Sequence, residues 1–103
     1  MKEITSYNEY YNIISTSKQF VVVDFTAKWC GPCQRMLPMI QQLERQYSNV
    51  VFLKIDVDNA KDIATKENIS SMPTFKFYKN GQKIHEFSGA SIQLLIQTIQ
   101  LNA

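Results

Sequence analysis

The sequence of 103 residues has few of the residues that build specialised folds: two cysteines, three glycines, three prolines and one histidine. Long apolar runs are also missing, because stretches such as Phe20–Val23 end after four residues, whereas a membrane span needs about 18. The segment Met1–Tyr7 carries charges early and lacks the apolar stretch of a secretory signal. We therefore expect a soluble, cytoplasmic protein. A chain from which a targeting segment has been removed would look the same, so an organelle stays an alternative.

Charge of one sign is not concentrated anywhere. Eleven Lys and Arg against nine Asp and Glu give a net charge of +2, without a run of five or six like charges. Nothing in this pattern indicates a nucleic-acid or membrane partner. Internal repeats, low-complexity tracts and linkers are absent too. Residues 1–103 are predicted to form a single domain that buries roughly two thirds of its unfolded surface.

The two cysteines, Cys30 and Cys33, are only three positions apart. So close a pair excludes a framework of disulfides between distant segments, which is how small secreted proteins compensate for a small core. The pair is therefore interpreted as serving chemistry rather than stapling the fold.

Hydrophobic periodicity predicts an alternation of helices and strands. Ser6, Asp58 and Ser91 are expected to cap helices, and Pro38 to kink the helix that follows the cysteines. Asn80–Gly81 indicates a hairpin with a type I′ turn. We predict helices at 7–17, from the cysteines to 47, at 58–67 and after 91, and strands at 2–5, 20–25, 50–57, 74–78 and 83–87. The expected fold is α/β, a central mixed five-stranded sheet flanked by four helices on both faces.

Cys30 follows a predicted buried strand and opens a helix, which places its sulfur at the helix N-terminus. There the unpaired backbone N–H groups and the helix dipole favour a thiolate, so Cys30 is the expected nucleophile, exposed in the turn. Cys33 falls one helical turn further along and inward, where it can resolve a mixed disulfide formed at Cys30.

Two other interpretations of the pair are a zinc site and inert buried thiols. Zinc usually takes four ligands, and beyond the two cysteines the chain offers only His85, so a zinc site would need dimerisation. Inert buried thiols are the other alternative, but Trp29 before the pair and Gly31–Pro32 within it suit a tight, exposed turn. No metal site is therefore predicted, and His85 is given no role.

With these residues the chain resembles the thioredoxin family over essentially its whole length. The resemblance rests on Val23-Asp24-Phe25, Ala27 to Cys33, Lys54 to Asp58, Met72-Pro73-Thr74-Phe75, Asn80-Gly81 and Gly89-Ala90. It implies the thioredoxin fold and a protein-disulfide reductase whose redox group is the cysteine pair, with no bound cofactor. It also implies a monomer that is recharged by a thioredoxin reductase, and clients such as peroxiredoxins, methionine sulfoxide reductase or ribonucleotide reductase.

Three residues depart from what many members of the family carry. Thr26 stands in place of an aromatic residue, Gln34 in place of Lys, and Ser88 in place of Val. These departures put the choice of partners in question.

The two residues between the cysteines bear on the direction of the reaction. Gly31 and Pro32 supply no cation to stabilise the thiolate further, which favours a reductant over an oxidant.

Asp24 interrupts an apolar strand, where an unpaired carboxylate has a raised pKa and can move protons. The resemblance implies that Asp24 accepts the proton of Cys33; a capping or solvent-facing carboxylate is the plainer alternative. Lys54 in the neighbouring strand is its expected partner, unless the lysine stem only lies along apolar surface with its ammonium group in water.

The resemblance further implies an apolar docking surface for client proteins beside the cysteines. Its members are Trp29, Gly31, Pro32, Met72, Pro73, Gly89 and Ala90. The Met72–Pro73 bond is expected to be cis, with Met72 offering its backbone to an extended client segment. Taken singly, these residues are equally compatible with packing or turns.

Two competing functions stay open. One is an oxidase or isomerase in an oxidising compartment, against which Gly31–Pro32 and the missing signal argue. The other is a binding module that uses the apolar surface and keeps the cysteines as passengers. Activity that survives replacement of both cysteines would favour the binding module.

Overall fold

Two apolar segments pair in the middle of a sheet. In the computed structural model, which describes residues 1–103, β2 (Phe20–Thr26) is buried along its whole length and β3 (Val50–Asp56) pairs parallel to it. A strand that is covered on both faces has a nearly continuous apolar sequence, which explains why polar and apolar residues hardly alternate in these two segments. β1 (Lys2–Glu3) pairs parallel with β3 and is shorter than the predicted strand at 2–5. Ile4, which follows it, is fully buried, and its backbone N–H still donates to Lys54 O at 3.0 Å.

An antiparallel hairpin completes the sheet. β4 (Thr74–Lys79) pairs with β2 and β5 (Gln82–Ser88) with β4, so the strand order is β1-β3-β2-β4-β5. The connecting residues Asn80 and Gly81 have φ of 53° and 80°, the left-handed values that a type I′ turn requires. The predicted mixed five-stranded sheet and its hairpin are confirmed.

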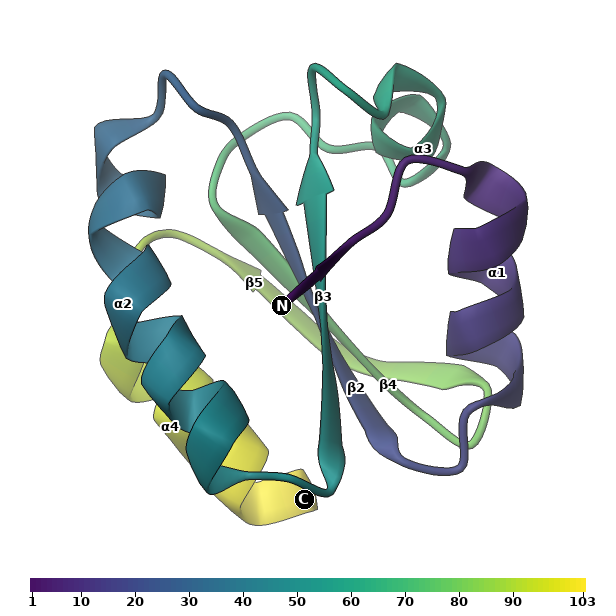
Figure 1. The fold of residues 1–103 in the computed structure, drawn as a ribbon, viewed down its shortest axis with the longest axis vertical. Coiled ribbons are helices and arrows are strands. Elements are labelled where there is room, and N and C mark those ends of the chain that lie inside the picture. The colour runs from purple at the N-terminus through teal and green to yellow at the C-terminus, as the bar shows by residue number, and fades with distance from the viewer.

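Helices cover both faces of the sheet (Figure 1). They are α1 (Tyr7–Thr16) and α3 (Lys61–Lys66) on one face, and α2 (Gly31–Gln46) and α4 (Ile92–Asn102) on the other. Two predicted caps are present: the backbone N–H of Glu9 donates to Ser6 Oγ at 3.3 Å, and that of Leu94 donates to Ser91 Oγ at 3.1 Å. None of these helices combines the length and the apolar character needed to cross a membrane.

The predicted cap at Asp58 is wrong. α3 begins at Lys61 and is preceded by Ala60, which makes no side-chain capping bond. The reason lies in the preceding turn, where Asp56 Oδ1 accepts hydrogen bonds from the backbone N–H groups of Asp58 at 2.9 Å and Asn59 at 3.4 Å. This turn delays the helix and leaves the Asp58 side chain free for another contact.

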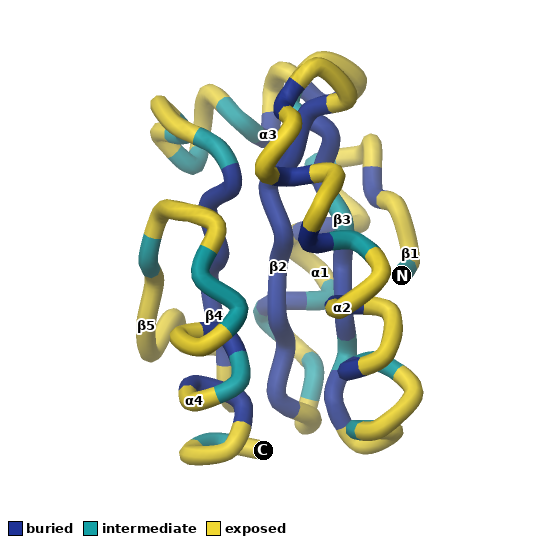
Figure 2. The backbone as a smooth tube through the Cα atoms, turned by 90° about the vertical axis from the view of Figure 1, so that its left-hand side faces the viewer, coloured by how far each residue is buried: buried dark blue, intermediate teal, exposed yellow.

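Each face of the sheet has its own hydrophobic core. Tyr10 and Val23 belong to the core beneath α1 and α3, whereas Val22 and Leu95 belong to the core beneath α2 and α4. Successive side chains of β2 point alternately into these two cores, so the strand is buried along its whole length (Figure 2).

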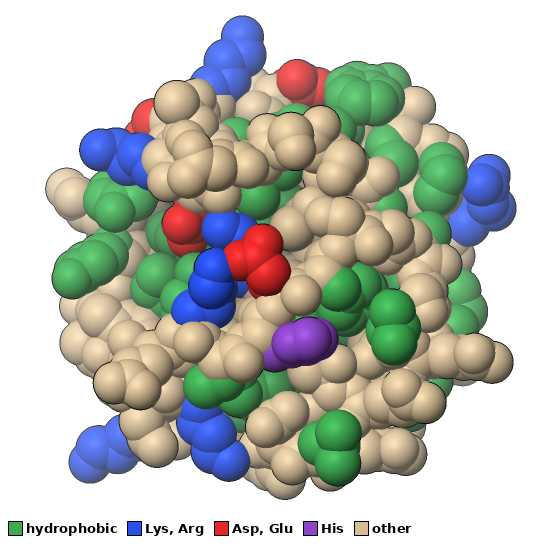
Figure 3. All heavy atoms as spheres, turned by 180° about the vertical axis from the view of Figure 1, so that it is seen from behind, with side chains coloured by type: hydrophobic (Ala, Val, Ile, Leu, Met, Phe, Trp, Pro, Cys, Tyr) green, Lys and Arg blue, Asp and Glu red, His purple; other side chains and the backbone are tan.

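The surface carries charges of both signs. On the face seen in Figure 3, acidic and basic side chains lie side by side near the middle instead of forming a patch of one sign.

Leu95→Ala is expected to lower the free energy of unfolding by about 2–5 kcal/mol, because it leaves a cavity in the core beneath α4. Leu95 is 0% exposed, whereas Leu101 on the same helix is 83% exposed. The matched control Leu101→Ala should therefore change the free energy of unfolding by less than about 0.5 kcal/mol. Urea unfolding of both variants measures the difference, and equal losses would show that this face of α4 is not buried as described.

Candidate active site

The cysteine pair lies where the chain passes from β2 into α2. Cys30 is the N-cap of α2, with extended backbone angles of φ −87° and ψ 105°, and it forms a disulfide with Cys33. The backbone N–H of Cys33 points to Cys30 Sγ at 3.2 Å. The predicted place of Cys30 at the helix N-terminus is therefore confirmed, and the structure represents the oxidised state of the pair.

Cys30 is less exposed than predicted. It is 6% exposed and Cys33 is 2% exposed, because Ala27, Val57 and Met72 pack around the disulfide. The expectation of an open, exposed turn applies to the neighbouring side chains rather than to the sulfur atoms. These neighbouring side chains therefore limit access to the sulfur atoms.

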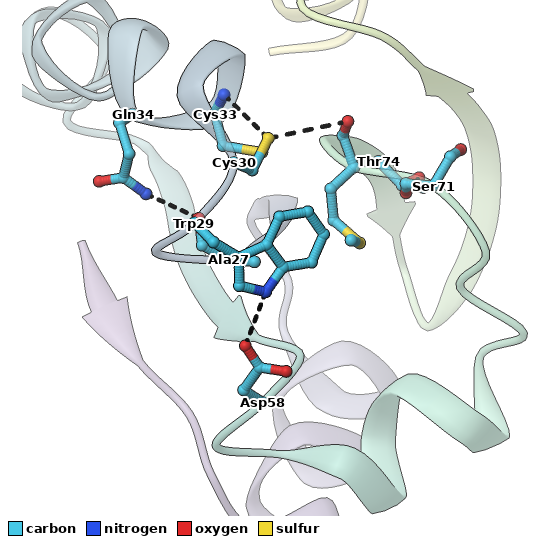
Figure 4. Close-up of a disulfide and its surroundings, with 9 residues drawn as sticks. Ala27, Trp29, Cys30, Cys33, Gln34, Asp58, Ser71 and Thr74 are labelled. Atoms are coloured by element: carbon cyan, nitrogen blue, oxygen red, sulfur yellow. Dashed lines mark hydrogen bonds between the residues drawn. A yellow bond between two sulfur atoms is a disulfide. The ribbon is translucent and has the colours of Figure 1, made fainter.

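Local sequence explains the shape of the turn. The backbone N–H of Cys30 donates to Ala27 O at 3.2 Å, and Pro32 in the first turn of α2 has no N–H that would need a partner. Gln34 Nε2 also donates to Ala27 O, at 2.9 Å, so this departure from the family pattern ties the turn to the helix (Figure 4).

The Met72 segment closes over the pair from the other side. Met72 O lies 3.9 Å from Cys30 Sγ, and the Met72–Pro73 peptide bond is cis, as the resemblance implied. The backbone N–H of Gly89 donates to Pro73 O at 2.9 Å, which connects the end of β5 to the same segment. The structure thus brings together residues that are far apart in the sequence.

Side chains around the disulfide form a partly exposed apolar surface. Trp29 is 68% exposed, and its Nε1 donates to Asp58 Oδ2 at 2.9 Å, a contact that sequence reasoning missed (Figure 4). Among the remaining predicted members, Pro73 is buried, Met72 is half-buried, and the others are exposed: Gly31, Pro32, Gly89 and Ala90. The predicted surface therefore has its members at one end of the sheet, with Pro73 beneath it.

Asp24 is buried on the side of β2 that faces α2. It is 2% exposed, and its Oδ1 has no hydrogen-bond partner. Burial raises the pKa of Asp24 to about 7, against an opposing effect of the positive charge of Lys54. A carboxyl group with this pKa can exchange a proton near neutral pH.

The predicted partnership of Asp24 with Lys54 is only partly right. Lys54 is opposite Asp24 in the parallel register of β2 and β3, so its charge acts on the carboxylate. Its Nζ, however, pairs with Glu3 Oε1 at 3.9 Å, because β1 brings Glu3 next to Lys54.

Thr26 Oγ1 is a second buried atom without a hydrogen-bond partner on this side of β2. In the sequence, Thr26 stood out only because many members of the family carry an aromatic residue at this position.

The zinc interpretation finds no support in the arrangement of side chains. No three His, Cys, Asp or Glu side chains come close enough together to bind a metal ion. His85 lies on the edge strand β5 against the rings of Phe77 and Phe87.

Comparison with known proteins gives a consistent result. A sequence model of the family Thioredoxin matches residues 2–101. The thioredoxin of Ictalurus punctatus is 59% identical over 83 residues, which are 79% of this chain and 78% of that protein. Thioredoxin 1 of Plasmodium falciparum is 45% identical over 100 residues, 97% of this chain and 95% of that protein.

Solved structures agree with this assignment over the full length. A thioredoxin from Plasmodium falciparum, 45% identical, superposes with a TM-score of 0.94 and covers 100% of both chains. The thioredoxin of Fasciola hepatica, 35% identical, also has a TM-score of 0.94 with 100% coverage of both. The chain therefore belongs to the thioredoxin family and is a thiol-disulfide oxidoreductase whose redox group is the pair Cys30 and Cys33.

Proposed function

We propose that Cys30 attacks the disulfide of a client protein and that Cys33 resolves the mixed disulfide. The position of Cys30 at the N-cap of α2, with the N–H of Cys33 directed at its sulfur, is the observation that carries this assignment. Both the N–H group and the helix dipole stabilise a thiolate at Cys30 once the disulfide is reduced.

Reduction of the client takes two thiol-disulfide exchange steps. The Cys30 thiolate forms a bond to one client sulfur, and the other client sulfur leaves as a thiolate. The Cys33 thiolate then attacks Cys30 Sγ, which forms the Cys30–Cys33 disulfide and releases the second client thiolate. The client gains two electrons and the pair loses two. A thioredoxin reductase, the partner that the family implies, returns them.

Asp24 is proposed to accept the proton of Cys33 before the second step. Its support is burial on the α2 side of the sheet together with a pKa of about 7, which lets the carboxylate take up a proton at neutral pH. Lys54 is proposed to assist through its charge, because it keeps that pKa from rising further.

We propose that an extended client segment lies across the apolar surface beside the disulfide. The half-buried Met72 offers its backbone there, next to the exposed Trp29. The further members are Gly31, Pro32, Pro73, Gly89 and Ala90.

The clients are proposed to include peroxiredoxins, with methionine sulfoxide reductase and ribonucleotide reductase as further candidates. Support comes from a solved structure, 37% identical with a TM-score of 0.92, determined for the thiol resolving mechanism of yeast mitochondrial 1-Cys peroxiredoxin via glutathione/thioredoxin systems.

We also infer that residues 1–103 act as one monomeric domain in the cytoplasm. Two cores on one sheet support the single domain.

Trp29→Ala tests the docking surface and should lower kcat/KM for a disulfide-bonded protein by about 10-fold, because exposed aromatic residues dominate such contacts. The rate with a small disulfide should change by less than about twofold, since no reacting atom is lost. Tyr11→Ala is the matched control, because Tyr11 is a 57% exposed aromatic residue on α1. Equal losses on both substrates would count against a docking role of Trp29.

A further inference from the structure

A polar cluster, buried except for the half-buried Glu67, lies on the face of the sheet opposite to α2. Its members are Tyr10 from α1, Glu67 at the end of α3, and Lys76 and Tyr78 from β4. Lys76 Nζ donates to Glu67 O at 2.8 Å and lies 3.7 Å from Glu67 Oε2. Glu67 Oε1 accepts from Tyr78 Oη at 3.0 Å and also from Tyr10 Oη, and the two hydroxyl groups are 3.2 Å apart.

This cluster has an unusual composition for a core. Lys76 is 5% exposed and Tyr10 is 1% exposed, yet both groups reach a partner. Replacing a buried ion pair by apolar side chains is often neutral or stabilising, so such a cluster is weak evidence for stability. Its hydrogen bonds are directional, however, and they define the relative position of the segments that carry them.

The segments tied by this cluster flank the Met72 loop. Glu67 directly precedes residues 68–73, and Lys76 follows them in β4, so the bond from Lys76 Nζ to Glu67 O bridges the two ends of the loop. At the helix end, the backbone N–H of Ile69 donates to Ala64 O at 3.0 Å. At the far end, Met72 O lies 3.9 Å from Cys30 Sγ.

We propose that Lys76 and Glu67 are positioning residues that close the loop 68–73 and thereby hold the Met72 backbone against Cys30 for an incoming client. Tyr10 and Tyr78 orient the Glu67 carboxylate from the side of α1 and β4. The effect is indirect, because all four residues lie on the opposite face of the sheet from the disulfide. This inference rests on the docking role proposed for Met72 above.

Lys76→Met removes the ammonium group and keeps a long apolar side chain. We expect KM for a disulfide-bonded protein to rise about fivefold with kcat within about twofold, and the rate with a small disulfide to stay unchanged. Lys79→Met is the matched control, because Lys79 is an exposed lysine of the same strand that bonds Asn102 O instead. Tyr78→Phe removes one bond to Glu67 with little change in volume and should give a smaller effect in the same direction.

Hydrogen exchange at Gly89 reports the loop independently of activity. Its backbone N–H donates to Pro73 O, so a loosened loop should speed its exchange about 10-fold relative to the amide of Val23 in both variants. Unchanged Gly89 exchange in Lys76→Met and Tyr78→Phe would overturn the positioning role. Faster exchange with an unchanged KM would support the positioning role but contradict the docking role of Met72, so the two failures are distinguishable.

Discussion

Cys30→Ser is expected to abolish protein-disulfide reduction. The hydroxyl group of serine is no nucleophile toward sulfur without strong activation, and the N-terminus of α2 then has no thiolate to stabilise. Reduced protein is mixed with a disulfide-bonded client, and the release of client thiols is followed over time. The loss should exceed about 10³-fold, because the reacting atom itself is removed.

Cys33→Ser should instead accumulate a stable mixed disulfide through Cys30. The first step stays intact, but the second step needs the thiolate that lies one helical turn away. Mass spectrometry of the variant after exposure to the client should show one adduct, located at Cys30. The same variant used on cell extract retains its covalent partners, so peroxiredoxins among them would support the proposed clients.

The two variants together assign the roles within the pair. Adducts on Cys33 in the Cys30→Ser variant, formed as fast as adducts on Cys30 in the reverse variant, would contradict the proposed direction of attack. Full biological activity of a variant lacking both cysteines would instead favour the binding module over a reductase.

Asp24→Asn should stabilise the oxidised protein, and increasingly so as the pH rises from about 4 to 7. The pKa of Asp24 is raised from 3.8 to about 7 in the fold, so within this window the folded state binds a proton that the unfolded state has lost. Stability of the wild type therefore decreases with pH through this window, by on the order of 4 kcal/mol for the full shift. The neutral amide removes this dependence.

Urea unfolding of oxidised wild type and Asp24→Asn from pH 4 to 8 measures the effect as a difference, in which the contributions of other groups cancel. The difference should grow up to about pH 7 and then stay constant. Asp62→Asn, which changes an exposed carboxylate, is the control and should show no such trend. A flat difference for Asp24→Asn would show that the carboxyl group is not buried without a partner.

The same substitution should slow turnover by on the order of 10-fold or more above pH 7, where the carboxylate of the wild type can accept a proton. Below about pH 6 Asp24 already holds a proton, so the two proteins should converge. Reduction rates against pH for both forms give the comparison. Identical profiles would rule out Asp24 as the proton acceptor of Cys33.

Features decided by residues close together in the chain could be predicted from the sequence. The apolar runs of β2 and β3, the caps at Ser6 and Ser91, and the turn at Asn80–Gly81 all depend on neighbouring residues. The placement of Cys30 at a helix N-terminus depends on the strand before it and the helix after it. Local preferences and hydrophobic periodicity therefore sufficed for the existence of the strands and helices and for the redox pair, although α3 begins later than predicted.

Other features depend on contacts between segments that are far apart in the sequence, and the pattern of neighbouring residues does not predict such contacts. Asp58 had the form of a cap, but the turn made by Asp56 and the approach of Trp29 gave it a different partner. The expected partner of Lys54 is Asp24, but β1 pairs with β3 and places Glu3 beside the Lys54 ammonium group.

By itself, then, the sequence determined the order of elements, the α/β class and the identity of the redox pair, because these follow from local periodicity and from a motif of adjacent residues. Only the tertiary structure decided that Met72 lies against Cys30 and that Asp24 is buried without a hydrogen-bond partner for Oδ1. It also decided that Lys76 reaches Glu67. Burial and partners are set by which strands and loops the sheet brings together, and this depends on the packing of the whole chain.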